Sequence, residues 1–116
     1  MAEGKGKDGL TVLVNEGTGK FTMLNGSPFQ AGQNPNRIAL GDVNGDGIND
    51  IATSDYEGNK IYLFIMDNAG HQLTGKAIPT GLHPKGIAIA DLNSDRKADI
   101  VVCNNADNNI TIIWGK

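Results

Sequence analysis

Two short acidic segments have residue types and a spacing that suit a metal ion. Each places side-chain oxygens at its first, third, fifth and ninth positions. Ca²⁺ takes about six to eight oxygen ligands at about 2.3–2.6 Å, whereas Mg²⁺ demands a stricter octahedron, so this pattern suits Ca²⁺ better. Three carboxylates this close together also repel one another unless a cation lies between them. The spacing therefore predicts two calcium loops: Asp42, Asn44, Asp46 and Asp50 in the first, and Asp91, Asn93, Asp95 and Asp99 in the second.

The second acidic loop lacks both glycines of the first. Ser94 stands where the first loop has Gly45, and Arg96 stands where it has Gly47. A residue other than glycine costs about 1 kcal/mol wherever the turn needs a positive φ. Arg96 and its neighbour Lys97 also bring positive charge close to the ion. We therefore expect the second loop to bind Ca²⁺ more weakly than the first.

The two acidic loops belong to a longer internal repeat. Shifting the chain by 49 residues places Pro35 on Pro84 and Asp50 on Asp99, together with matching apolar positions on either side. A period of roughly 40–50 residues is typical of propellers and other repeat architectures. The repeat therefore predicts that the same structural unit occurs more than once in the chain.

The predicted elements are short strands separated by turns. Runs rich in β-branched and aromatic residues alternate with Asp-, Asn- and Gly-rich connectors, and no segment shows a sustained helical period, so the predicted class is all-β. The first repeat has predicted strands at 37–41, 50–54 and 60–65 and a weaker one at 72–78. The second has them at 86–90, 99–103 and 109–114, and a third, broken copy has them at 10–14 and 20–24.

Segments 38–51 and 86–102 resemble FG-GAP/VCBS-type repeats, the blades of integrin alpha-subunit propellers, some fungal lectins and many bacterial secreted proteins. The resemblance implies a β-propeller with Ca²⁺ between the first and second strands of each blade, and an extracellular location. It adds the backbone carbonyls of Ile48 and Lys97 to the two ligand sets. It also divides the chain into a flexible lead-in at 1–8, a partial blade at 9–33, a complete blade at 34–81 and a partial blade at 82–116.

About two blades cannot close a ring, because propellers have typically about 4–8. We expect a homo-oligomer, a trimer or a tetramer, that closes the ring through heterologous contacts. The N-terminal strand pair would then complete the C-terminal blade of the same or a neighbouring chain. The alternative is that this chain is a piece of a longer protein and is marginally stable alone.

Composition and motifs argue against several other functions. The net charge is −3 and there is no basic cluster, so nucleic acid is an unfavourable partner. No apolar run approaches the roughly 20 residues that span a bilayer. His71 and His83 fall in predicted loops outside any catalytic motif, and Cys103 is expected to be a small buried residue. We therefore expect no enzymatic activity.

The expected function is a calcium-stabilised module that acts as a self-assembling scaffold or as an adhesion and interaction surface. The alternative is a lectin, because some proteins with this repeat hold sugars between blades. A glycan would use aromatic platforms, and the candidates are Tyr56, Tyr62 and Trp114. Trp114 lies in a strand pattern in which packing in the core is the default expectation.

Overall fold

The computed structural model describes residues 9–15, 17–23, 29–66 and 73–115. These residues form eleven strands in four antiparallel sheets, and none of them is helical. The all-β class predicted from the sequence is therefore confirmed. The lead-in at 1–8 and His71 lie outside the described residues.

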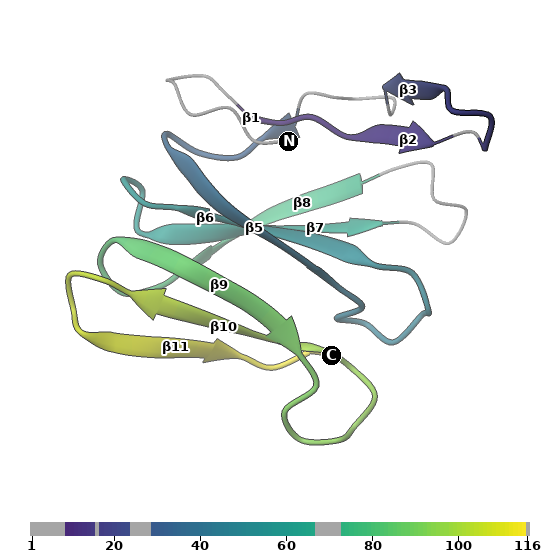
Figure 1. Ribbon diagram of the computed structural model, residues 1–116. Helices are drawn as coiled ribbons and strands as arrows, with labels where there is room; N and C mark the ends of the chain where they lie inside the picture. The colour runs from purple at the N-terminus through teal and green to yellow at the C-terminus, as the bar shows by residue number, and fades with distance from the viewer. Residues whose placement is uncertain (1–8, 16, 24–28, 67–72, 116) are drawn as a thin grey trace.

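The largest sheet contains four strands that follow one another along the chain (Figure 1). They are β5 (Pro35–Gly41), β6 (Asp50–Asp55), β7 (Lys60–Met66) and β8 (Leu73–Pro79), paired in that order. All four correspond to predicted strands, including the weaker fourth one. We call this four-stranded sheet the central sheet.

A second sheet repeats the first three strands of the central sheet. It contains β9 (Pro84–Ala90), β10 (Asp99–Asn104) and β11 (Asn109–Ile113), in the order β11-β10-β9. The repetition extends to a local irregularity: the register of the first strand shifts after Pro35 in the central sheet and after Pro84 in the second. Proline has no N–H for the ladder, so such a shift suits its position at the start of a strand.

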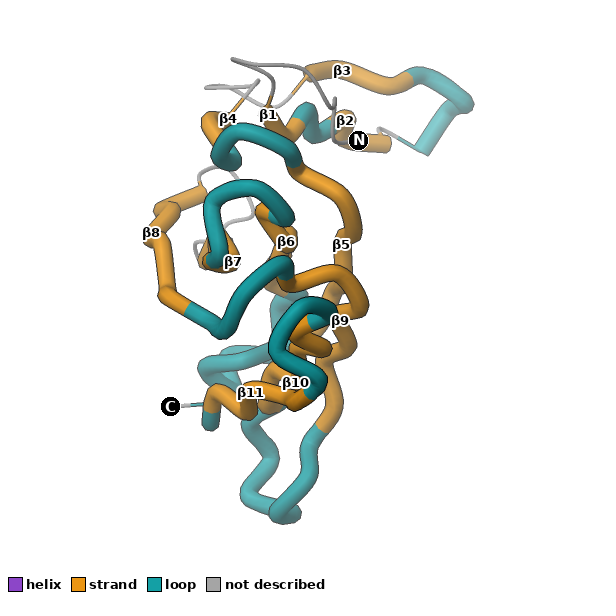
Figure 2. The backbone as a smooth tube through the Cα atoms, turned by 90° about the vertical axis from the view of Figure 1, so that its left-hand side faces the viewer, coloured by secondary structure: helices purple, strands orange, loops and turns teal. Residues whose placement is uncertain are grey.

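Both faces of the central sheet pack against other parts of the chain. Successive side chains of a strand point to opposite faces, and the two faces belong to different cores. One face packs against β9–β11 and the other against the N-terminal strands, so the molecule has three layers in chain order (Figure 2). The first core contains Val43, Ala52, Ile61, Leu63, Ile100 and Val102, and the second contains Leu10, Ala31, Ile51 and Phe64.

The N-terminal layer differs from its prediction. The single strand predicted at 10–14 is divided into β1 (Gly9–Leu10) and β2 (Leu13–Asn15). β2 pairs with β3 (Phe21–Met23) as expected, but β1 pairs with β4 (Phe29–Gln30), which the sequence pattern did not predict. A Cβ at Gly9 would overlap the carbonyl oxygen of Phe29, so only glycine allows this close approach.

Two expectations about burial are wrong. Cys103 is exposed, and Trp114 is 51% exposed just beyond the end of β11. Cys103 lies opposite Ile110, which is also exposed, on the face of β10–β11 that points away from the central sheet. No other sheet of the described residues covers that face. These apolar side chains therefore stay exposed because no described sheet packs over their face.

Candidate metal centre

The first acidic loop connects β5 to β6 and wraps around the carboxylate of Asp42. One oxygen of Asp42 accepts hydrogen bonds from the backbone N–H groups of Gly45 at 2.8 Å and Asp46 at 3.1 Å. The other oxygen accepts from the N–H of Gly47 at 2.6 Å. Asp46 in turn accepts from the N–H of Ile48 at 2.9 Å. The acidic side chains thus set the path of the loop backbone.

The second acidic loop connects β9 to β10 and folds in the same way. Asp91 accepts hydrogen bonds from the N–H groups of Asp95 at 3.2 Å and Arg96 at 2.9 Å, and Asp95 accepts from Lys97 at 3.0 Å. The two loops also touch, because the N–H of Ala98 donates to the carbonyl of Asp42 at 2.8 Å. The repeat in the sequence therefore produces a repeated loop conformation.

The last carboxylate of each loop is buried and ties the loop to its sheet. The carboxylate of Asp50 accepts from the N–H groups of Val43 and Met66, both at 3.0 Å. Asp99 accepts from the equivalent residues of its own repeat, Leu92 at 2.9 Å and Gly115 at 2.8 Å. A carboxylate has about four lone-pair sites, so two hydrogen bonds leave acceptor capacity for a cation.

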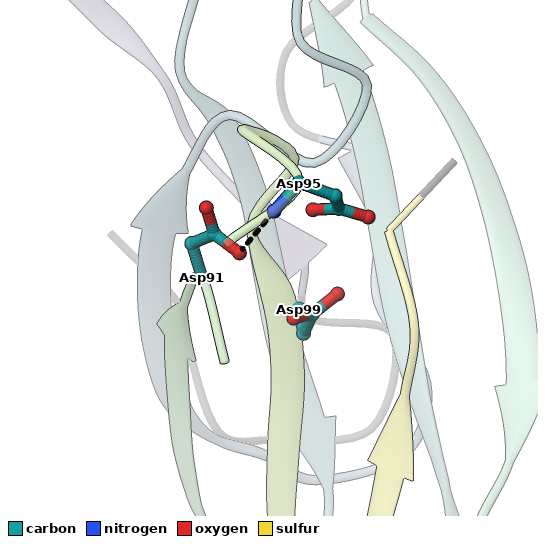
Figure 3. Close-up of side chains that lie close together, drawn as sticks. All are labelled: Asp91, Asp95 and Asp99. Carbon is teal, nitrogen blue, oxygen red and sulfur yellow. Dashed lines mark hydrogen bonds between the residues drawn. The ribbon is translucent and has the colours of Figure 1, made fainter. Parts of the chain in front are cut away.

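Three carboxylates meet in the second loop. Oxygen atoms of Asp91, Asp95 and Asp99 all lie within 4.8 Å of one another (Figure 3). Oxygens that share one Ca²⁺ ion at about 2.3–2.6 Å can lie up to about 5 Å apart, so this group fits a single ion. Within the described residues, the acids of the first loop do not form an equally close group.

The amide of Asn93 lies beside the same carboxylates. With its nitrogen turned toward them, it donates to Asp95 at 2.9 Å and to Asp91 at 3.2 Å. With its oxygen turned toward them, it adds a fourth oxygen to the group, which is favourable only when a cation is present. The residue types and positions around Asp99 therefore suit a hard cation.

The pKa values of the loop acids reflect these surroundings. The N–H of Arg96 is the main reason why the pKa of Asp91 lies below its ordinary value of 3.8. Partial desolvation raises the pKa of Asp42, but the N–H groups of Gly47, Gly45 and Asp46 outweigh it and leave that pKa lowered.

Asp50 behaves in the opposite way. Burial raises its pKa above 3.8 despite two hydrogen bonds, and the negative charges of Asp46 and Asp42 raise it further. A bound cation would relieve this repulsion, because an opposite charge favours the ionised carboxylate. The electrostatics of the first loop are thus compatible with a cation as well.

The turn glycines of the first loop do need their conformational freedom. Gly45 has φ of 77° and Gly47 has φ of 86°. In the second loop Ser94 and Arg96 adopt the same region, with φ of 61° and 70°. Both loops therefore need a positive φ at these two positions, and the second loop carries backbone strain that the glycines of the first avoid.

The three aromatic candidates for a sugar platform lie in different places. Tyr56 packs against His83, with ring centroids 4.4 Å apart. Tyr62 packs against the core between the central sheet and the N-terminal layer. Trp114 lines a cavity beside β11. Neither Tyr56 nor Tyr62 lines this cavity.

Two further polar residues, not predicted from the sequence, have a structural role. Asp55 is fully buried at the end of β6 and accepts from the N–H groups of Gln33 at 3.2 Å and Asn34 at 3.0 Å. Asn104, its equivalent at the end of β10, accepts from the N–H of Gly81 at 3.1 Å. Each residue anchors the segment that enters its sheet. Their 49-residue separation is the signal that could have identified them.

Stacked, repeated antiparallel sheets with an acidic loop between their first and second strands define a blade-type β-repeat protein. A family model described as FG-GAP-like repeat matches residues 2–53 and again residues 42–102, and the chain belongs to this family. The resemblance proposed from the sequence is therefore confirmed. No curated protein and no solved structure matches the chain. No helix in the described ranges is long and apolar enough to cross a membrane.

Proposed function

We propose that this chain is a non-enzymatic, calcium-binding β-propeller module that acts as a scaffold or adhesion surface outside the cell. The observation that carries the proposal is the approach of the carboxylates of Asp91, Asp95 and Asp99 to within 4.8 Å of one another. Membership of the FG-GAP-like repeat family supports the propeller architecture and the interaction role.

The donor atoms favour Ca²⁺ over other metals. All candidate ligands are carboxylate, amide or carbonyl oxygens, which suit hard cations rather than zinc or copper. In the second loop the ligands would be Asp91, Asn93, Asp95 and Asp99 with the carbonyl of Lys97. In the first they would be Asp42, Asn44, Asp46 and Asp50 with the carbonyl of Ile48.

The role of the ion would be structural. Asp99 already joins the second loop to the N–H of Gly115, just beyond β11, so a cation on Asp99 would cross-link the loop to two strands. A ligand that binds only the folded state stabilises it by about 2.7 kcal/mol at roughly 100 times its Kd. Calcium at extracellular, millimolar levels would fill even a weak site of this type.

The experiment is a thermal melt with calcium and with EDTA. We expect EDTA to lower the melting temperature strongly, Asp46→Asn and Asp95→Asn each to remove part of that difference, and the double variant to remove nearly all of it. Glu57→Gln, which neutralises an exposed acid in the β6–β7 turn, is the matched control and should keep the full difference. A melting temperature that EDTA does not change would refute the calcium proposal.

A further inference from the structure

A cavity of about 590 Å³ lies beside the last strand of the second sheet. Leu63, Ile65 and Ile78 of the central sheet line one side, and Ile113 and Trp114 at the end of β11 line the other. Among the described residues β11 pairs with β10 alone, so its second edge is bare. The equivalent edge in the central sheet, on β7, is covered by β8. The cavity therefore lies where a fourth strand of the second sheet would run.

The strand β3 has the properties of that missing strand. Its side chains are exposed, with Phe21 at 58% and Met23 at 57%. In the repeat, residues 10–14 correspond to 61–65, so Leu13 corresponds to Phe64. Leu13 lies opposite Met23 just as Phe64 lies opposite Gly75 of β8. β3 thus pairs with β2 in the register in which β8 pairs with β7.

The β3 strand of a chain cannot fill the cavity of that same chain. Figures 1 and 2 both show β2 and β3 on one side of the central sheet and β9–β11 on the other. The central sheet lies between β3 and the cavity. β3 can therefore reach the cavity only from a second copy of the chain.

We propose that β3 of a second copy leaves its own β2 and pairs with the bare edge at the end of β11 and the two residues that follow it, with Met23 opposite Ile113. The proposal rests on the blade architecture of the proposed function and names the partner. Residues directly opposite each other in an antiparallel pair share a face. Met23 therefore shares the face of Ile113, and Phe21, two residues away, points to the same side, into the cavity.

The exchange retains hydrogen bonds and gains apolar burial. β3 makes three residue pairs with β2, and in the proposed register the same edge of β3 lies opposite Ile113, Trp114 and Gly115 instead. Phe21 and Met23, both more than half exposed in their own chain, become buried against Leu63 and Ile65. Adding a strand to an exposed sheet edge is a general mode of recognition. In the repeat, the released β2 corresponds to residues 113–115, which are the residues that β3 would pair with in the second copy.

Each copy donates a strand near its N-terminus and accepts one near its C-terminus. Such a heterologous contact closes into a ring or continues as an open chain. At 12.2 kDa per copy, a ring of three copies has a mass of about 37 kDa and a ring of four about 49 kDa. Light scattering over a range of concentrations measures this directly, and a mass of 12.2 kDa at every concentration would overturn the proposal.

Trp114 reports on the cavity because it is the single tryptophan of the chain and lines the cavity wall. We expect its emission to shift to shorter wavelengths as the chains associate. Met23→Lys should leave a folded monomer without this shift. Leu13→Lys is the matched control, because Leu13 lies opposite Met23 and is 58% exposed but belongs to the released β2. Equal loss of association in both variants would indicate non-specific apolar contact and overturn the proposal.

A mixing experiment tests the direction of the contact. Thr74→Phe fills the cavity from exposed Thr74 of β8 and blocks acceptance while leaving β3 intact. Met23→Lys blocks donation and leaves the cavity open. Each variant alone should be monomeric, and a one-to-one mixture should give a two-chain species of about 24 kDa. A mixture that stays monomeric would overturn the exchange, whereas an EDTA melt of monomeric Met23→Lys tests the calcium proposal separately.

Discussion

The carboxylate of Asp99 accepts a hydrogen bond from the backbone N–H of Gly115 at 2.8 Å, which joins the second acidic loop to the chain just beyond the last strand. Its other oxygen accepts from the N–H of Leu92 at 2.9 Å, near the start of the loop. Asp99 is fully buried. This carboxylate therefore organises its repeat before any ion binds, and Asp50 does the same in the first repeat.

Replacing Asp99 by asparagine should destabilise the metal-free protein. An amide has one acceptor oxygen, so Asp99→Asn leaves one of the two N–H groups facing another donor. A buried donor without a partner costs about 1–3 kcal/mol. Urea unfolding in EDTA measures this loss without any contribution from calcium. Asp91→Asn is the comparison, because Asp91 is exposed; equal losses in the two variants would contradict a special role for the buried carboxylate.

Replacing Arg96 by glycine should strengthen the second loop. Arg96 has φ of 70°, where glycine is more stable by about 1 kcal/mol. The change also removes a positive charge next to the ion, so both stability and calcium affinity should rise. Calorimetric calcium titration and thermal melts check the two effects. Gly47→Arg in the first loop is the reverse change and should weaken binding, and an Arg96→Gly variant with unchanged affinity would count against the second site.

Replacing Thr53 by valine should stabilise the central sheet. Thr53 is fully buried, and its hydroxyl has no hydrogen-bond partner among the described residues. The repeat itself has Val102 at the equivalent position, also fully buried. Removing an unsatisfied buried hydroxyl gains about 1 kcal/mol. Urea unfolding measures the gain, Val102→Thr should show the opposite sign, and a destabilised Thr53→Val would show that the hydroxyl has a partner.

Lowering the pH should destabilise the metal-free protein through Asp42 and Asp91. The pKa of each is lowered by folding from 3.8, so the unfolded chain binds more protons at a pH between the two values. Their stabilisation is therefore complete above the unfolded pKa and is lost as the pH falls through the folded one. Asp50, whose pKa is raised, has the opposite effect above 3.8.

Melting temperatures in EDTA between about pH 2 and pH 5 test this dependence. The wild-type melting temperature should fall as the pH drops below 3.8, and that of Asp91→Asn should fall less steeply because residue 91 no longer titrates. If Asp91→Asn shows the wild-type slope, the hydrogen bonds from the loop N–H groups do not control acid stability.

Most of the two repeats could be predicted from local sequence. Strands such as β6 and β10 are short β-branched runs between turn residues, and the acidic loops have a fixed spacing, so neither depends on distant contacts. The pairing of β1 with β4 could not be predicted, because it depends on the close approach of Gly9 to Phe29, 20 residues away. The convergence of Asp91, Asp95 and Asp99 was predicted from spacing, but the anchoring of Asp99 by Gly115 was not.

Burial is what only the tertiary structure decided. Ile61 and Ile110 are the same residue type at the same place in the repeat, yet Ile61 is fully buried and Ile110 is 56% exposed. The sequence by itself determined that both lie in strands with alternating faces. It could not determine which face another sheet covers: the sheet β9–β11 packs over Ile61, and no described strand packs over Ile110. Local pattern specifies a strand and its faces, whereas burial depends on what lies opposite.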